Sequence, residues 1–292
     1  MKIVAYKADL SEIGMRKGGG ASRRWALVGA YAALVVFMLF LLVPPYYMLL
    51  VSLKTNSDLL AKAGNHFWFQ EWPTLAHYFQ LLFATPFLRQ LGNTVLVSSL
   101  VALITLAVSI PAAYSLTRLH FWGSTALTIG VFITYLVPET LLFIPFFKIV
   151  VKLGVYNSKW VLVVVYPTLT VPFCTWILLG YFASVPREMD EAAMVDGAGP
   201  IQMMVRVFIP VTLPGIIAAT IFAFVVAWSN FIYPLAFILN EAETVLTAGM
   251  VSIDGVQLKM AGSLIASMPP LLVYAFLMDY YVAGLTRGEV IR

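Results

Sequence analysis

The chain has 292 residues, of which 61% are hydrophobic and only 11% are charged, whereas roughly a quarter of the residues in a soluble domain are charged. So few charges cannot cover a water-exposed surface of this size, and lipid must therefore surround most of the chain. The formal net charge of +4 is too small to indicate nucleic acid binding, and the single cysteine, Cys174, excludes an intrachain disulfide and a thiolate metal cluster.

Residues 1–24 form a basic segment that we interpret as a cytoplasmic tail. Its basic residues are Lys2, Lys7, Arg16, Lys17, Arg23 and Arg24. The apolar run that follows, Trp25–Val51, is much longer than the roughly 7–15 apolar residues of a signal peptide. We therefore expect this run to be retained as the first membrane span.

Six apolar stretches are long enough to cross a bilayer, which takes about 20 residues. They are Trp25–Val51, Leu91–Thr117, Phe121–Phe147, Trp160–Val185, Val211–Leu239 and Met260–Leu285. Because backbone groups cannot stay unpaired in lipid, each stretch is predicted to be helical. The sequence thus predicts an all-α integral membrane protein with six transmembrane helices and with both termini on one side.

Basic residues orient the spans, because short cytoplasmic loops are enriched in lysine and arginine. With cytoplasmic termini, eleven of the 18 basic residues lie inside, six of them in the tail, and seven lie outside. The connections 52–90 and 240–259 are then external, and the connection 186–210 is cytoplasmic. The orientation depends on the tail, because three lysines lie on the unfavoured outer side: Lys148, Lys152 and Lys159.

The sequence contains no catalytic or metal-binding motif. The glycine run 18–20 is not followed by the lysine and the hydroxyl residue of a phosphate-binding loop. The histidines His66, His77 and His120 have no metal-ligand spacing, and no serine- or zinc-hydrolase motif is present. We therefore expect no enzymatic activity, metal or cofactor in this chain, so that the energy for transport comes from a partner or an ion gradient.

A few polar residues lie within the apolar stretches. Glu139 and Asp279 are the acidic ones, and charge inside a membrane often has a function. Asn230, beside Trp228 and Tyr233, could bind a polar solute on a translocation path. Local pairing of Glu139, and a hydrogen bond from Asn230 to a neighbouring helix, are the structural alternatives.

The connection 186–210 is predicted to form two short helices. Pro186 suits a first helical position, and Gly197 fits the left-handed residue that ends the first helix. Pro200 can begin the second helix, and Pro210 is expected to end it. Acidic residues in the first turns oppose the positive end of the helix dipole: Glu188, Asp190 and Glu191.

The same connection carries a spaced motif. Glu191-Ala192-Ala193 precedes Met194, Val195 and Asp196, then Gly197, and nine residues later Val207-Phe208-Ile209-Pro210. This spacing resembles the EAA motif of ABC importer permeases, in which Glu-Ala-Ala, three residues, Gly and nine residues precede Ile-x-Leu-Pro.

Other segments resemble the carbohydrate-importer branch of that family. These are Trp72-Pro73-Thr74-Leu75 with Tyr78, and Asn93-Thr94 in the second span. The ending 284–290 is similar to the tail of maltose-importer permeases of the "G" type, although Arg287 and Glu289 replace smaller residues. The resemblance implies transport of a carbohydrate, in particular an oligosaccharide, with an acidic, alginate-type saccharide as one option.

The resemblance also implies a type I ABC importer permease fold in the bacterial inner membrane, with a cytoplasmic coupling helix in the connection 186–210. The implied partners are a second, non-identical permease subunit that packs on the first span, two ATPase subunits that bind ATP and magnesium, and an extracytoplasmic solute-binding protein. The residues implied to couple to the ATPase are Glu188, Asp190, Glu191, Ala192, Ala193, Met194, Asp196, Gly197 and Pro210.

Two other functions are consistent with six spans. An ion-coupled secondary transporter would need coupling charges near the middle of the membrane and no ATPase. A membrane scaffold would use the connection 186–210 only as a docking site and would move no solute.

Overall fold

The computed structural model describes residues 20–61, 67–119 and 121–288, with side chains described for residues 24–61, 67–119 and 121–278. All regular structure in these ranges is helical. In chain order the elements are α1 (Gly20–Leu53), α2 (Asn56–Leu60), α3 (Ala76–Ala84), α4 (Phe87–Arg118), α5 (Ser124–Tyr135), η1 (Glu139–Leu142), α6 (Phe143–Lys152), α7 (Trp160–Ala183), α8 (Arg187–Val195), α9 (Pro200–Met203), η2 (Met204–Phe208), α10 (Ile209–Val211), α11 (Leu213–Ser229), α12 (Ile232–Phe237), α13 (Leu246–Ser252) and α14 (Val256–Gly288).

The predicted all-α membrane fold is confirmed. Four of the described helices, α1, α4, α7 and α14, are each long and apolar enough to cross a membrane. Two bent pairs bring the number of candidate spans to six if each pair is one span: α5 with η1 and α6, bent by 95°, and the segment from α9 to α10 with α11, bent by 84°.

The stretch Phe121–Phe147, predicted to be helical, is broken into separate helical segments. The helix α5 ends at Tyr135, and the chain turns before η1 begins at Glu139. Pro138, with ψ 129°, lies at the break. A proline has no N–H to donate and disfavours helical backbone in the residue before it, so the span stops there.

The stretch Val211–Leu239 is also broken into separate helical segments. α11 ends at Ser229, and Asn230 has extended backbone, with φ −65° and ψ 132°. The Asn230 side-chain oxygen then accepts a hydrogen bond from the Tyr233 N–H, at 3.3 Å, as α12 begins. Asparagine is a favoured cap for such a restart.

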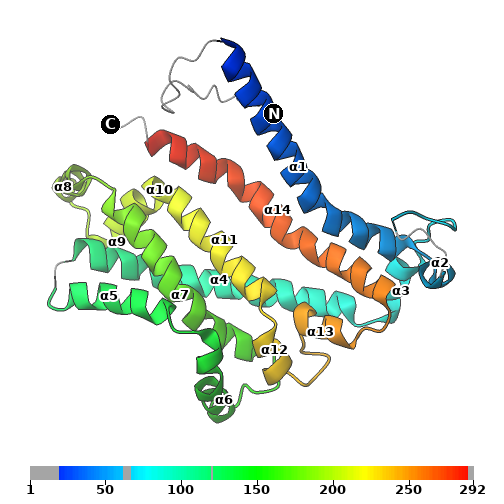
Figure 1. Cartoon of the computed structure of the whole chain (residues 1–292). Helices are drawn as coiled ribbons and strands as arrows, with labels where there is room; N and C mark the ends of the chain where they lie inside the picture. Colours follow the sequence, from blue (N-terminus) through cyan, green and yellow to red (C-terminus); the bar gives the residue numbers. More distant parts are fainter. Residues whose placement is uncertain (1–19, 62–66, 120, 289–292) are drawn as a thin grey trace.

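A bundle of α4, α7, α11 and α14 forms the body of the molecule (Figure 1). α4 packs mainly on α7 and α11, and α11 also packs on α14. Two clusters of buried side chains hold these helices together. One contains Phe182, Phe208 and Leu178, and the other is built around Tyr166, Tyr233 and Phe237.

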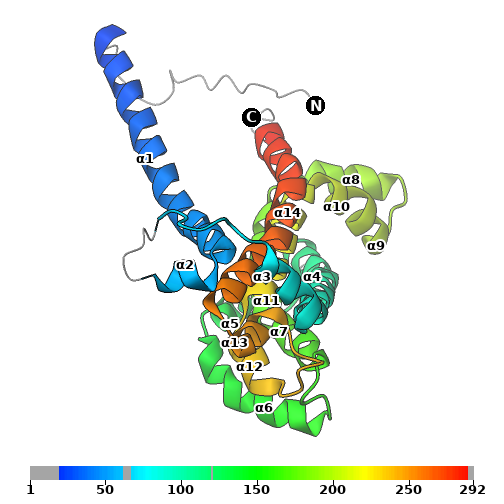
Figure 2. The ribbon, with the colours of Figure 1, turned by 90° about the vertical axis from the view of Figure 1, so that its right-hand side faces the viewer.

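The first helix lies largely apart from this bundle (Figure 2). Residues 24–47 of α1 are exposed along their whole length, and burial begins near Leu50. At this end Lys54 forms a buried ion pair with Asp58, at 3.3 Å. Burial raises the pKa of Asp58, but hydrogen bonds from the Gln70 N–H and from Lys54 outweigh that effect and lower it.

Polar side chains of α4 fix the connection before α13. The Asn93 amide donates to the carbonyl oxygens of Ala242, at 3.1 Å, and Thr244, at 2.9 Å. The Thr94 hydroxyl accepts from the Leu246 N–H, at 2.8 Å. The Asn93-Thr94 pair therefore provides hydrogen bonds to backbone groups that would otherwise be buried without partners.

Gly215 allows α11 to approach α7 closely, and its replacement tests this packing. A Cβ atom there would lie 2.4 Å from two atoms at the root of the Tyr181 ring and 3.0 Å from the Tyr181 Cβ, so the tyrosine must leave its rotamer or α7 must shift. We expect Gly215→Ala to lower the free energy of unfolding by about 1–3 kcal/mol, measured by thermal unfolding in detergent.

Gly180→Ala on α7 is the matched control, because a Cβ atom there meets nothing within 4 Å. Alanine is also favoured over glycine in a helix by up to about 1 kcal/mol. Equal melting temperatures for the two variants would contradict this account of the α7–α11 contact.

Candidate functional site

The connection between α7 and α11 forms the predicted pair of short helical segments. α8 begins at Arg187, one residue later than expected, and Pro186 is the residue before the helix, with ψ 142°. Glu188 and Asp190 fall in its first turn, where negative charge stabilises the N-terminal end of a helix.

The end of α8 confirms the predicted role of Gly197. Its φ of +81° lies in the left-handed region that glycine adopts most easily. Its N–H donates to the Met194 carbonyl, at 3.0 Å, and the Ala198 N–H donates to the Ala193 carbonyl, at 2.9 Å. This pair of bonds is the Schellman motif, which ends a helix and sets the direction of the chain after it.

The second helical segment starts at Pro200 as predicted but does not end at Pro210. α9 continues through the π-helical turn η2 into α10, and Pro210 lies inside α10. The wider turn precedes the proline, whose missing N–H would otherwise leave a gap in the α-helical bonding. The segment ends at Thr212, whose N–H and hydroxyl both donate to the Phe208 carbonyl.

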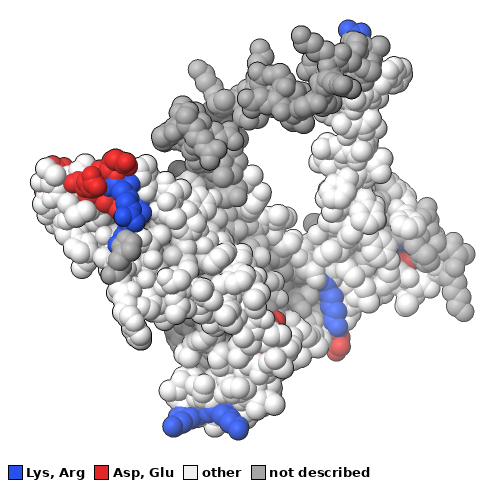
Figure 3. Space-filling view, turned by 60° about the vertical axis from the view of Figure 1, so that its left-hand side comes forward, with Lys and Arg blue, Asp and Glu red and all other residues white. Residues whose placement is uncertain are grey.

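One face of α8 is open and combines acidic with apolar side chains. Residues three and four apart share a helix face, and four such residues are exposed: Glu188, Glu191, Ala192 and Val195. Val195 is 89% exposed and the neighbouring Met194 is 58% exposed. Figure 3 shows acidic atoms gathered at this end of the molecule, next to basic ones.

The other residues singled out in this helix differ in exposure. Asp196 and Gly197 are exposed, and Ala193 is half-buried. Asp190 points the opposite way, since it is only 9% exposed and its carboxylate Oδ2 lies 2.8 Å from Arg118 Nε at the end of α4. Neighbouring acids in the sequence therefore have different surroundings.

Three of the four candidate path residues meet at the two breaks in the membrane helices. The Asn230 amide donates to the Glu139 carboxylate, at 3.2 Å. The Tyr233 hydroxyl donates to the Glu139 carbonyl, at 2.7 Å. Glu139 and Asn230 are half-buried, whereas Tyr233 is buried. A carboxylate and an amide that are both accessible can hydrogen-bond to hydroxyl groups of a solute.

Trp228 does not join this group. Its indole N–H donates to the Ala266 carbonyl of α14, at 3.1 Å, so that it links two helices. Several other positions from the sequence lie outside the described residues: the tail 1–19, His66, His120, the segment 289–292 and the side chains of Asp279 and Arg287. Among the described residues, no three His, Cys, Asp or Glu side chains lie close enough to hold a metal ion.

The three lysines of α6 and of the segment before α7 are of two kinds. Lys148 and Lys152 are exposed on α6, and Figure 3 shows basic atoms at the corresponding tip of the molecule. Lys159 instead pairs with Glu243, at 3.4 Å. Burial raises the pKa of Glu243, but the Lys159 N–H, the Lys159 charge and the Ser158 hydroxyl together lower it.

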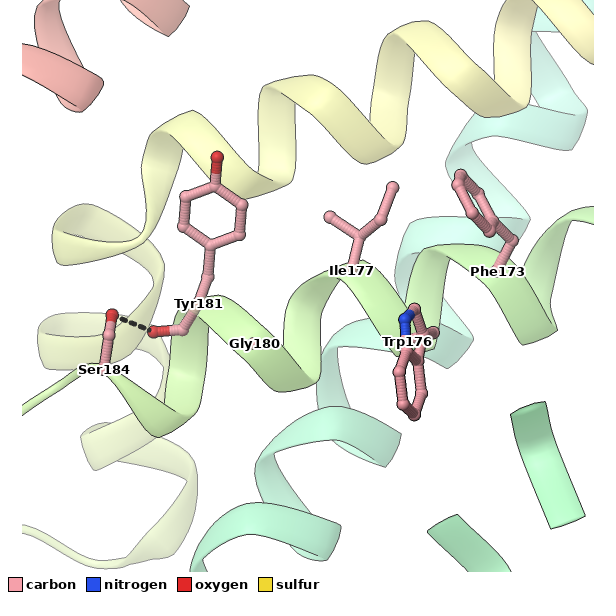
Figure 4. A pocket seen from close by; sticks show the side chains of 6 residues that line it. All are labelled: Phe173, Trp176, Ile177, Gly180, Tyr181 and Ser184. Carbon is pink, nitrogen blue, oxygen red and sulfur yellow. Dashed lines mark hydrogen bonds between the residues drawn. The ribbon is translucent and has the colours of Figure 1, made fainter. Parts of the chain in front are cut away.

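An open groove of about 580 Å³ runs along the second half of α7 and was not predicted from the sequence (Figure 4). All its lining residues come from this helix: Phe173, Trp176, Ile177, Gly180, Tyr181 and Ser184. α7 is apolar around its whole circumference, so no periodicity in its sequence marks which face stays open.

Comparison with known proteins relates this geometry to transporters. The model of the family described as "Binding-protein-dependent transport system inner membrane component" matches residues 106–287. A sulfoquinovosyl glycerol transport system permease protein of Agrobacterium fabrum is 32% identical, over 85% of this chain and 88% of that protein. A trehalose/maltose transport system permease protein of Thermococcus litoralis is 31% identical, over 74% and 81%.

The fold also matches a solved structure, a bacterial ABC transporter involved in the import of the acidic polysaccharide alginate. The TM-score is 0.74, covering 91% of this chain and 99% of that chain, at 18% sequence identity. At this identity the likeness concerns the fold alone.

Proposed function

Because the chain belongs to the family of binding-protein-dependent transport system inner membrane components, we propose that it is the permease subunit of an ATP-driven importer that carries a carbohydrate into the cytoplasm. The observation that carries this proposal is the exposed acidic and apolar face of α8, placed between two membrane elements inside the family-matched region. An ion-coupled transporter is less well supported, since the family is defined by its dependence on a binding protein.

The partners follow from the same architecture. The open face of α8 is the proposed contact for one of two ATPase subunits, which bind ATP and magnesium themselves. The exposed length of α1 (residues 24–47) is the proposed contact for a second, non-identical permease subunit. A solute-binding protein would approach the opposite end, where α6 carries its lysines.

We further propose that Glu139, Asn230 and Tyr233 line the solute path. Transporters commonly bind solutes where membrane helices are broken, because the freed polar groups face a cavity. The break after α5 and the break after α11 meet at these three residues. Trp228 is bonded to α14 and is not part of this group.

Both termini are proposed to be cytoplasmic, and the connection 52–90 external. In Figure 1 the start of α1, the end of α14 and α8 lie on the upper side, and α2 and α6 lie lower. A cysteine at the exposed Ser57, in a Cys174→Ser background, should react with a membrane-impermeant maleimide added outside. Labelling only from the cytoplasmic side would refute this orientation.

The solute is proposed to be an oligosaccharide, on the basis of the relatives named above. In proteoliposomes with the binding protein, a saccharide should stimulate ATP hydrolysis, whereas phosphate and amino acids should not. Exposed Lys148 and Lys152 favour an acidic saccharide and Glu139 opposes one, so neutral and uronate oligosaccharides are compared. Stimulation by non-saccharides alone would overturn the substrate class.

Glu191 and Gly197 are expected to couple ATP hydrolysis to transport. Removing one member of a partly desolvated pair between Glu191 and a basic ATPase residue can cost about 3–5 kcal/mol, because the other charge is stranded, whereas loss of an exposed pair costs only about 0–1 kcal/mol. Glu191→Lys should therefore abolish uptake, and Glu191→Gln should reduce it less. Gly197→Val should also uncouple, because its φ of +81° strains any side chain.

The measurement is uptake and solute-stimulated ATP hydrolysis in reconstituted complexes, after a check that each complex assembles. Glu12→Lys, the same substitution in the N-terminal segment, is the control. Normal coupling in both Glu191→Lys and Gly197→Val would rule out α8 as the element that faces the ATPase.

A further inference from the structure

The inner end of α4 carries one arginine that contacts three separate elements. Arg118 is the last residue of α4, and its Nε lies 2.8 Å from the Asp190 carboxylate of α8. Its Nη2 donates to the Val185 carbonyl in the short link between α7 and α8. Its Cζ lies 4.8 Å from the centre of the Phe208 ring in η2. A planar guanidinium suits this combination of ion pair, hydrogen bond and ring contact.

The surroundings of this guanidinium are mostly desolvated. The side chain of Arg118 is 11% exposed and that of Asp190 is 12% exposed. Phe208 is fully buried, with its ring 5.1 Å from Tyr114 and 5.3 Å from Phe182. Charge pairs in such surroundings are screened little by salt.

α8 itself has few other attachments. Its main packing neighbour among the described elements is η2, and non-helical links flank it at 184–186 and 196–199. α4, in contrast, packs along α7 and α11 through the centre of the bundle. A firm connection between α8 and the bundle therefore depends on the contacts of Arg118.

We propose that Arg118 and Asp190 are positioning residues that lock α8 to the end of α4, so that displacement of α8 by the ATPase moves the membrane bundle. The proposal deepens the proposed function and depends on α8 being the ATPase-facing element. Asp190, on the inner face of α8, then holds this helix to α4, and Glu191, on the outer face, contacts the ATPase.

The test uses the complete complex in proteoliposomes and measures solute taken up per ATP hydrolysed. Arg118→Gln and Asp190→Asn should each lower this ratio by about tenfold or more, because removing one partner strands a poorly solvated charge. The double variant should be no worse than either single variant, because the two groups act as one unit. Arg118→Lys keeps the charge but not the planar geometry, and should recover an intermediate ratio.

Arg89→Gln at the exposed start of α4 is the matched control and should keep the wild-type ratio. A purely structural role would lower the yield or melting temperature and leave the ratio in assembled complexes unchanged, which would overturn the proposal. Failure of Arg118→Gln, Arg118→Lys and Asp190→Asn to assemble would also overturn it, by assigning the pair to folding.

The outcomes separate this proposal from the proposed function. If Glu191→Lys uncouples the complex and Arg118→Gln keeps the wild-type ratio, only the positioning role is wrong. If Glu191→Lys and Gly197→Val both couple normally, the assignment of α8 itself is wrong.

Discussion

Inside a bilayer no water is available to pair with a peptide group, and an unpaired group there costs several kcal/mol. The chain meets this condition with helices and, where helices break, with side chains. The Tyr233 hydroxyl pairs with the carbonyl of Glu139, directly after Pro138, and the Thr247 hydroxyl pairs with the carbonyl of Asn230, at 2.8 Å. The two breaks thus lie together and share partners, which brings polar side chains to one place within an apolar bundle.

The two ends of the bundle are held in different ways. At the end that carries the start of α4, neutral hydrogen bonds of Asn93 and Thr94 fix backbone segments. On the side of α8, one guanidinium joins three elements. Several neutral hydrogen bonds hold the first end rigidly. The position of α8, in contrast, depends on the few contacts of one charged group.

Much of the fold could be predicted from the sequence, because composition and apolar length alone identify membrane spans. The left-handed turn at Gly197 could be predicted too, since the glycine requirement is local. The break at Pro138 could not be distinguished from the unbroken helix through Pro44 and Pro45, because the outcome depends on neighbours distant in the sequence.

The sequence likewise did not show that Asp190 points inward and Glu191 points outward. Both acids occupy the same helix, and the partner of the inward-pointing one, Arg118, lies far away along the chain. The open face of α7 was hidden for another reason: a helix that is apolar all round carries no periodic signal. Sequence patterns therefore identified the elements, and three-dimensional contacts assigned roles to their faces.

The separation of α1 from the bundle has a consequence for biogenesis. Residues 24–47 are exposed, so this segment can exchange lipid neighbours for protein neighbours without disturbing any buried contact of its own chain. The core of the subunit can therefore fold without the contacts that most of this helix would make in a larger assembly. A newly synthesised copy can therefore fold its own core before α1 contacts another subunit, whichever of the two subunits is synthesised first.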